Sequence, residues 1–100
     1  MQMVMMIFRT SLQSEVLPLV EQEELPFTRF DGVQGQGATG GVSGSVPWGG
    51  SNTVLLLVVP DERLSRFHER VHQFQDGLKA QAKSVGVPFH IFVLPCIQWF

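Results

Sequence analysis

The sequence predicts an α+β fold in which a four-stranded antiparallel sheet carries two helices on one face. The chain contains four apolar runs of strand length, and two segments between them have the three- and four-residue spacing of amphipathic helices. These elements follow one another in the order βαββαβ. That order is the split-βαβ, ferredoxin-like pattern, and right-handed crossovers place both helices on the same face of the sheet.

The first half of the chain is predicted to form a strand, a short helix and a second strand. The first strand covers residues 3–9, and the helix after it ends near Glu24. Pro18 lies inside the helical stretch, so the helix is expected either to kink or to begin late, at Ser14. The second strand covers residues 27–33, and strict alternation places three side chains on one face: Phe27, Arg29 and Val33.

A long uncharged segment separates the second strand from the third. Eight of the ten glycines lie between Gly32 and Gly50, and no Asp, Glu, Lys or Arg occurs from Gly32 to Pro60. Without charged or bulky anchors, so many glycines do not favour a single backbone conformation. Residues 34–52 are therefore predicted to form a long flexible loop, and loops of this length in compact domains are usually functional or disordered.

The second half of the chain is predicted to form a strand at residues 53–59, a helix after Asp61 and a last strand at residues 89–97. One apolar stripe runs along this helix and consists of Leu64, Phe67, Val71, Phe74, Leu78, Ala82 and Val85. The third and fourth strands are apolar on both faces, although a sheet with one face in water alternates. We therefore expect other copies of the chain to cover the second face.

Length and composition restrict the classes of function. One hundred residues, 44% of them apolar, predict a single folded domain over residues 1–100. A net charge of −2 argues against a nucleic acid as the main partner. The single Cys96 excludes an internal disulfide, and no apolar run approaches the roughly 20 residues of a membrane span. Because residues 1–8 lack the features of a signal peptide, a cytoplasmic location is expected.

The sharpest motif is His68-Glu69-Arg70-Val71-His72, which has the His-Glu-x-x-His pattern of zinc metalloproteases. In those enzymes the two imidazoles bind zinc and the glutamate acts as the general base. Here the motif lies in the predicted long helix, and only Asp76 and His90 follow it as further ligands. An amphipathic helix with two flanking histidines is the favoured interpretation, ahead of a metal-binding surface and of a protease.

Four features resemble the PII-type signalling proteins over nearly the whole chain. Residues 3–9 look like the family's first strand, which ends in an arginine. Val33-Gln-Gly35-Gln-Gly37 matches the step that opens the family's long T-loop, and the uncharged segment to Asn52 has that loop's length and position. His90-Ile-Phe-Val-Leu-Pro95 looks like the family's last strand, with His90 in place of a lysine. The chain is therefore identified as a diverged PII-like protein.

The resemblance implies a non-enzymatic homotrimer that binds an adenine nucleotide or a related small molecule between its subunits. The long loop would then dock on a target enzyme, transporter or channel. Ligand contacts are expected from the loop and from two residues near it: Gly35, Gly37, Thr39, Gly40, Arg9 and His90. Trp48 is the one aromatic residue of the loop and is expected to contact the partner.

The sequence also departs from the family at several places. Thr39 stands where the family carries a glutamine used for metal and 2-oxoglutarate, the chain has no tyrosine for the family's modification, and no arginine-rich segment follows the last strand. A different nucleotide, bicarbonate, another small anion and a metal therefore remain open as ligands. The alternative is a CutA-type trimer that binds copper or zinc through His68, His72 and His90. A zinc hydrolase with Glu69 as base is a third interpretation.

Overall fold

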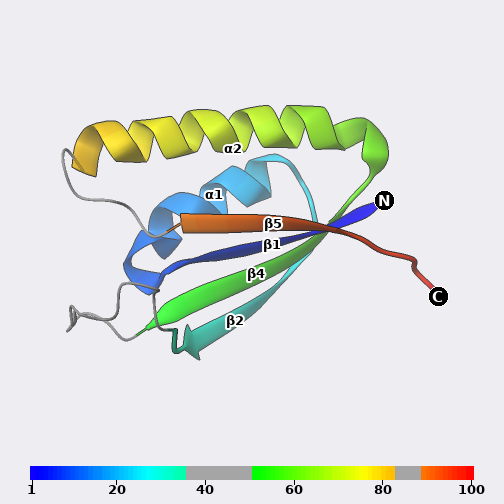
Figure 1. Cartoon of the computed structure of the whole chain (residues 1–100), viewed down its shortest axis with the longest axis horizontal. Helices are drawn as coiled ribbons and strands as arrows, with labels where there is room; N and C mark the ends of the chain where they lie inside the picture. The colour runs from blue at the N-terminus through cyan, green and yellow to red at the C-terminus, as the bar shows by residue number, and fades with distance from the viewer. Residues whose placement is uncertain (36–50, 83–88) are drawn as a thin grey trace.

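The computed structural model describes residues 1–35, 51–82 and 89–100, and the described residues form four strands and two α-helices (Figure 1). In chain order these are β1 (Gln2–Arg9), a 3-10 turn (Thr10–Leu12), α1 (Gln13–Gln22), β2 (Phe27–Val33), β4 (Asn52–Val59), α2 (Asp61–Ala82) and β5 (Phe89–Pro95). Both helices lie on one side of the sheet (Figure 1). The predicted ferredoxin-like βαββαβ fold is confirmed.

Strand β1 lies inside the sheet, whose order is β2-β4-β1-β5 with every neighbouring pair antiparallel. Met5 of β1 pairs with Leu56 of β4 on one side and with Phe92 of β5 on the other. Residues that pair directly across antiparallel strands point to the same face of the sheet. This register therefore divides the apolar side chains between an inner face, under the helices, and an outer face.

The inner face and the helices form the core. Its fully buried strand residues alternate along β1 and β4 and are Val4, Met6, Phe8, Leu55, Leu57 and Val59. The predicted stripe of α2 packs on them through Phe67, Val71 and Leu78, and α1 contributes Val16, Leu19 and Val20. Each such side chain contributes about 2 kcal/mol when it is fully removed from water. Burial of these apolar stripes therefore fixes both helices on one face.

Pro18 lies in the middle of α1, which nevertheless runs without interruption from Gln13 to Gln22. A proline inside a helix removes one backbone donor and crowds the preceding turn. The helix begins one residue before the late start predicted at Ser14, and a 3-10 turn precedes it. Neither described helix combines the length and the apolar composition that crossing a membrane requires.

A β-bulge interrupts β2 near its end. Phe30 pairs with Val54, whereas Val33 pairs with Asn52, so three steps along β2 span two steps along β4. Gly32 within this stretch has a φ of 67°, the left-handed conformation that glycine adopts without steric cost. The extra residue reverses the faces to which the following side chains point.

The bulge overturns the predicted alternation of β2. Phe27 and Arg29 pair with inner-face residues of β4, but Val33 pairs with Asn52 on the outer face. The expectation that all three side chains share one face is therefore wrong at Val33. The physical reason is that an inserted residue shifts the two-residue period of the strand by one.

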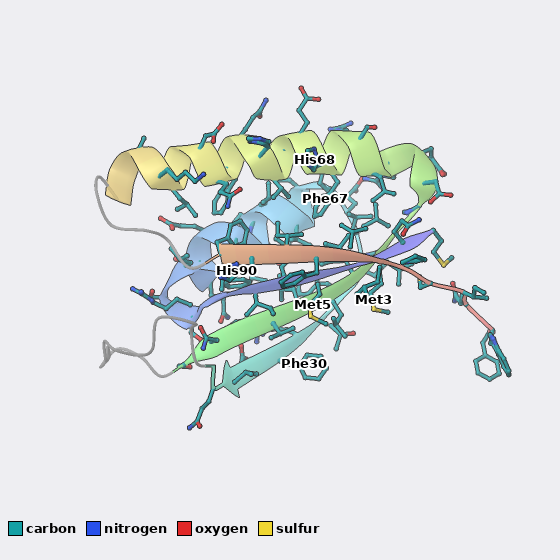
Figure 2. The ribbon with its side chains drawn as sticks, viewed as in Figure 1. Met3, Met5, Phe30, Phe67, His68 and His90 are labelled. Carbon is teal, nitrogen blue, oxygen red and sulfur yellow. The ribbon has the colours of Figure 1, made fainter. Side chains whose placement is uncertain are left out.

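The outer face is apolar and open in the single chain. By register it consists of Met3, Met5 and Ile7 of β1, Val54, Leu56 and Val58 of β4, Thr28 and Phe30 of β2, and His90, Phe92 and Leu94 of β5. Figure 2 shows Met3, Met5 and Phe30 on the side away from α2, and Phe67 on the side toward it. Phe30, Val58, Phe92 and Leu94 are each between 39% and 53% exposed. A surface of this kind is typical of an interface.

Candidate functional site

One end of the sheet gathers three of the predicted ligand contacts. Arg9 ends β1 and pairs with Asn52 at the start of β4, while His90 near the start of β5 pairs with Ile7. These pairings place Arg9 and His90 on the outer face. Gly35 follows the end of β2 and lies beside Asn52. The structure therefore brings Arg9, Gly35 and His90 to the same end of the sheet.

Gly35 makes a close approach at this end. A Cβ atom added to Gly35 would lie 3.4 Å from the side-chain Nδ2 of Asn52, which is the short limit of an ordinary van der Waals contact. Arg9, which is half-buried, pairs with the same asparagine across the β1–β4 ladder. Asn52 therefore lies next to both the glycine and the arginine.

A cluster of polar side chains lies at this end, on the inner side. The hydroxyl of the fully buried Thr53 lies 3.0 Å from that of Thr10, 3.3 Å from Oε1 of Gln13 and 3.5 Å from Oδ1 of Asp31. The hydroxyl of Thr10 also lies 3.0 Å from that of Ser51, whose carbonyl accepts the Thr10 N–H at 3.1 Å. Because a hydroxyl carries one hydrogen, Thr53 donates to either Gln13 or Asp31 at any one time, and its oxygen can also accept from Thr10.

The polar cluster ties four elements together at the base of the long segment. Thr10 follows β1, Gln13 begins α1, Asp31 belongs to β2 and Thr53 to β4. Among the described residues, no buried side-chain nitrogen or oxygen lacks a hydrogen-bond partner. The cluster therefore connects these elements by hydrogen bonds on the inner face, at the end of the sheet where Arg9 and His90 lie on the outer face.

Four predicted contacts cannot be placed. Gly37, Thr39, Gly40 and Trp48 fall in residues 36–50, outside the described residues. Their roles in ligand or partner contact stay predictions, as does the flexibility of residues 34–52. The third strand in the chain, β4, begins at Asn52, one residue earlier than predicted. The last residue of the predicted loop, Asn52, therefore belongs to a strand.

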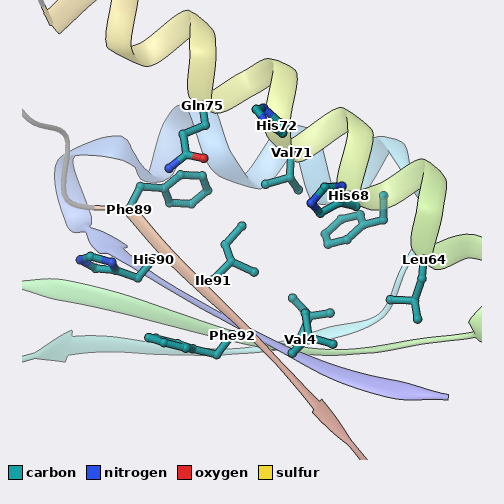
Figure 3. A pocket seen from close by; sticks show the side chains of 12 residues that line it. Val4, Leu64, His68, Val71, His72, Gln75, Phe89, His90, Ile91 and Phe92 are labelled. Carbon is teal, nitrogen blue, oxygen red and sulfur yellow. The ribbon is translucent and has the colours of Figure 1, made fainter.

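The His-Glu-x-x-His motif lies on α2, where His68, Glu69 and His72 are exposed. The rings of the two histidines contact each other edge to face, with centroids 5.9 Å apart. Both histidines line a groove of about 390 Å³ between α2 and β5, whose floor includes Ile91 (Figure 3). Within the described ranges, no three His, Cys, Asp or Glu side chains form a group that could hold a metal ion.

His90 does not complete the motif, although it borders the same groove. Figure 3 shows Phe89 and Ile91 pointing toward α2, whereas His90 and Phe92 point away from it. The His90 ring is stacked on that of Phe92, with centroids 6.5 Å apart. The structure thus separates His90, on the outer face, from the two histidines of the helix.

Sequence reasoning missed two features: the polar cluster around Thr53 and the groove between α2 and β5. The members of the cluster are distant in the chain, so no local spacing reveals them. A threonine at an inward-facing position of an otherwise apolar strand was the available signal, because a buried hydroxyl requires a partner. The groove lies between α2 and the edge strand β5, whose side chains are not adjacent to those of α2 in the sequence.

Comparison with known proteins gives structural matches only. No protein-family model matches the sequence, and no curated protein is significantly similar to it. CPII from Thiomonas intermedia K12, in a structure with ADP, AMP and acetate, matches with a TM-score of 0.65 at 14% identity over 93% of this chain and 82% of that one. CPII is described as a nitrogen regulatory PII-like protein.

Two further solved structures are also similar. A Thermus thermophilus protein, provisionally described as a PII-like signalling protein, has a TM-score of 0.55 at 19% identity over 92% of this chain and 82% of its own. A DUF3240-family protein from Shewanella baltica has a TM-score of 0.63 at 13% identity over 99% and 92%. These likenesses span nearly the whole chain and both helices and strands. The chain therefore has the PII-like fold in a diverged form.

Proposed function

We propose that this chain is a non-enzymatic, cytoplasmic regulatory protein that binds a small anionic effector between the subunits of a homotrimer. The proposal rests on one observation. Arg9, Gly35 and His90 lie at the same end of the sheet, whose outer face is apolar and open. A guanidinium, a ring N–H and backbone N–H groups are donors suited to a phosphate or carboxylate. The effector would change the conformation of residues 34–52, which act on a partner protein.

The outer face supports the assembly. A chain of this size buries only about 60–65% of its surface when it folds alone. Phe92 and Leu94 on β5 and Phe30 on β2 leave large apolar surfaces in water on a face that already contains Met3 and Met5. Packing three such faces around one axis would remove these side chains from water and would bring the ends of neighbouring sheets together. Arg9 and His90 would then line clefts between subunits.

The structural relatives support the class of effector. CPII was solved with ADP, AMP and acetate, and also with ADP and bicarbonate. Both kinds of ligand carry negative charge, which matches the donors at the end of this sheet. His90 stands where the wider family has a lysine, and for that reason we place ADP, AMP and bicarbonate ahead of ATP.

The position of the two ends of the long segment supports its proposed role. Val33 and Asn52 bracket it and pair with each other on the outer face, close to Arg9. An effector held there would contact the segment's first residues, including Gly35, and would bias its conformation through contacts made in one state only. Trp48 would supply the apolar contact with the target enzyme, transporter or channel.

Calorimetric titration with ADP, AMP and bicarbonate tests the proposal on the untagged full chain, together with its native mass. We expect a mass of three chains and saturable binding of at least one of these ligands. Arg9→Ala and His90→Ala should weaken that binding, whereas Arg29→Ala and His68→Ala, which are matched in residue type and lie on the other side of the sheet, should not. A monomer, or equal effects of all four substitutions, would contradict the proposal.

A further inference from the structure

We propose that His68 and His72 of α2 form a chelating site for a divalent transition-metal cation of the Cu²⁺, Ni²⁺ and Zn²⁺ class. The inference does not depend on the proposed effector site, which lies at Arg9 and His90 on the opposite face of the sheet. Residues four apart on a helix lie on one face, one turn above the other. Imidazole nitrogen is a preferred ligand of these three cations.

The two rings already have the required spacing. Their centroids are 5.9 Å apart and their planes are nearly perpendicular, at 87°. A tetrahedral cation bound about 2 Å from one nitrogen of each ring would hold the two centroids about 5 Å apart. Both side chains are exposed and project from a helix whose opposite face is packed on the sheet. We therefore expect side-chain rotation alone to close the chelate.

Asp76 adds a second feature of metal-binding histidines. Its Oδ2 lies 3.5 Å from Nδ1 of His72, one helical turn further along α2. A carboxylate beside Nδ1 favours the ring proton on that nitrogen and Nε2 as the ligand atom. His68, His72 and Asp76 thus lie at four-residue spacing, with two ligands and one orienting carboxylate. The carboxylate is a positioning residue, because it acts through His72.

The groove beside the helix determines what kind of site this is. His68 and His72 line the groove on the α2 side, and the apolar side chains of Phe89 and Ile91 line it on the β5 side (Figure 3). With no third ligand among the described residues, two protein nitrogens leave coordination positions for water. The motif therefore supplies an open, exchangeable site rather than a closed structural one. Glu69 is exposed on the same helix and is not required for it.

The test is a Zn²⁺ titration of the full chain by competition with a chromophoric chelator. All proteins carry Cys96→Ser, because the thiol is partly accessible and would also bind the cation. We expect one saturable site per chain that His68→Ala and His72→Ala each remove. Asp76→Ala should weaken it by about tenfold, the size of effect expected for an orienting partner. His90→Ala is the matched control and should leave the affinity unchanged.

A second readout uses Cu²⁺ and electron paramagnetic resonance, which counts coordinated nitrogens. The parent protein should show two imidazole nitrogens, and His68→Gln should show one. Because both histidines are exposed, the variants should retain the helical circular dichroism of the parent. Saturable Zn²⁺ binding that survives in the His68→Ala/His72→Ala double variant, its loss in His90→Ala, or no binding by the parent would each overturn the inference.

Discussion

The carboxylate of Glu23 lies 2.9 Å from the guanidinium of Arg70, and this pair joins the two helices on the covered face of the sheet. Glu23 follows α1 and is only 2% exposed. Arg63 and Arg66 of α2 also face its Oε1, at 3.9 and 3.5 Å. Arg63 additionally donates a hydrogen bond to the Glu23 backbone carbonyl. One buried carboxylate thus fixes three arginines along one side of α2.

Removing this carboxylate should destabilise the protein. We expect Glu23→Ala to lower the free energy of unfolding by about 2 kcal/mol, less than for a fully buried pair because the arginines reach solvent. Urea unfolding followed by circular dichroism measures the change. Glu21→Ala, an exposed carboxylate on the same helix, is the control and should change stability little. Equal effects of the two substitutions would mean that the arginine cluster does not hold the helices together.

Two glycines should respond in opposite directions to alanine. Gly32 has a φ of 67° at the bulge, so Gly32→Ala should destabilise by about 1 kcal/mol although nothing lies within 4 Å of the added Cβ. Gly77 lies inside α2 with the same open space, so Gly77→Ala should stabilise by about 1 kcal/mol. Thermal unfolding of the two variants checks both signs. If Gly32→Ala also stabilised the chain, the left-handed bulge would be disproved.

The buried hydroxyl of Thr53 should be required to hold Ser51 and Thr10 in place. Thr53→Val keeps the shape of the side chain but removes its hydrogen bonds, which should cost about 1 kcal/mol. The Thr10 amide, which donates to the Ser51 carbonyl, should then exchange its hydrogen faster. Thr53→Ser retains the hydroxyl and should preserve the slow exchange even if it loses stability. If the Thr10 amide hydrogen exchanged equally slowly in Thr53→Val, the side-chain cluster would not be needed for the hydrogen bond between Thr10 and Ser51.

The outer face should control assembly rather than folding. Leu56 lies in the row that also holds Met5 and Phe92, so Leu56→Arg would place a charge in the middle of the apolar surface. We expect sedimentation to show a single chain with its circular dichroism intact. Ser65→Arg, at an exposed position of α2, is the control and should leave the assembly unchanged. A Leu56→Arg protein that still assembles would locate the interface elsewhere.

Much of this fold was predictable from the sequence, because the spacing of apolar residues along a helix or strand can be recognised within a short stretch of chain. The stripe through Phe67, Val71 and Leu78 indicated the buried side of α2, and the β2 boundaries match the prediction. The end of the predicted stripe, at Val85, lies outside the described residues, and β5 ends at Pro95, two residues before its predicted end. Strict alternation failed at Val33, since one glycine with positive φ inserts a residue that the pattern does not reveal. The late start predicted from Pro18 was nearly right, because α1 begins at Gln13, one residue before Ser14.

The candidate site was predictable only in part. Arg9, Gly35 and His90 were selected through a resemblance, and the register then brought them to one end of the sheet. The contact between His72 and Asp76 joins residues four apart on one helix, so it could have been predicted from their spacing. The position of His90 on the opposite face from His68 was not, because it depends on the register of β5 on β1.

The central place of β1 has a consequence for how the chain acquires its structure during synthesis. Gln2 pairs with both Val59 and Pro95, so this strand leaves the ribosome before its partners and keeps a free edge until β5 has followed. Contacts between residues so far apart in the chain form slowly, because a long loop must close before they are made. Until then the apolar edge of β1 can pair with a neighbouring nascent chain. The yield of native protein should therefore fall when translation is slow and chains are crowded.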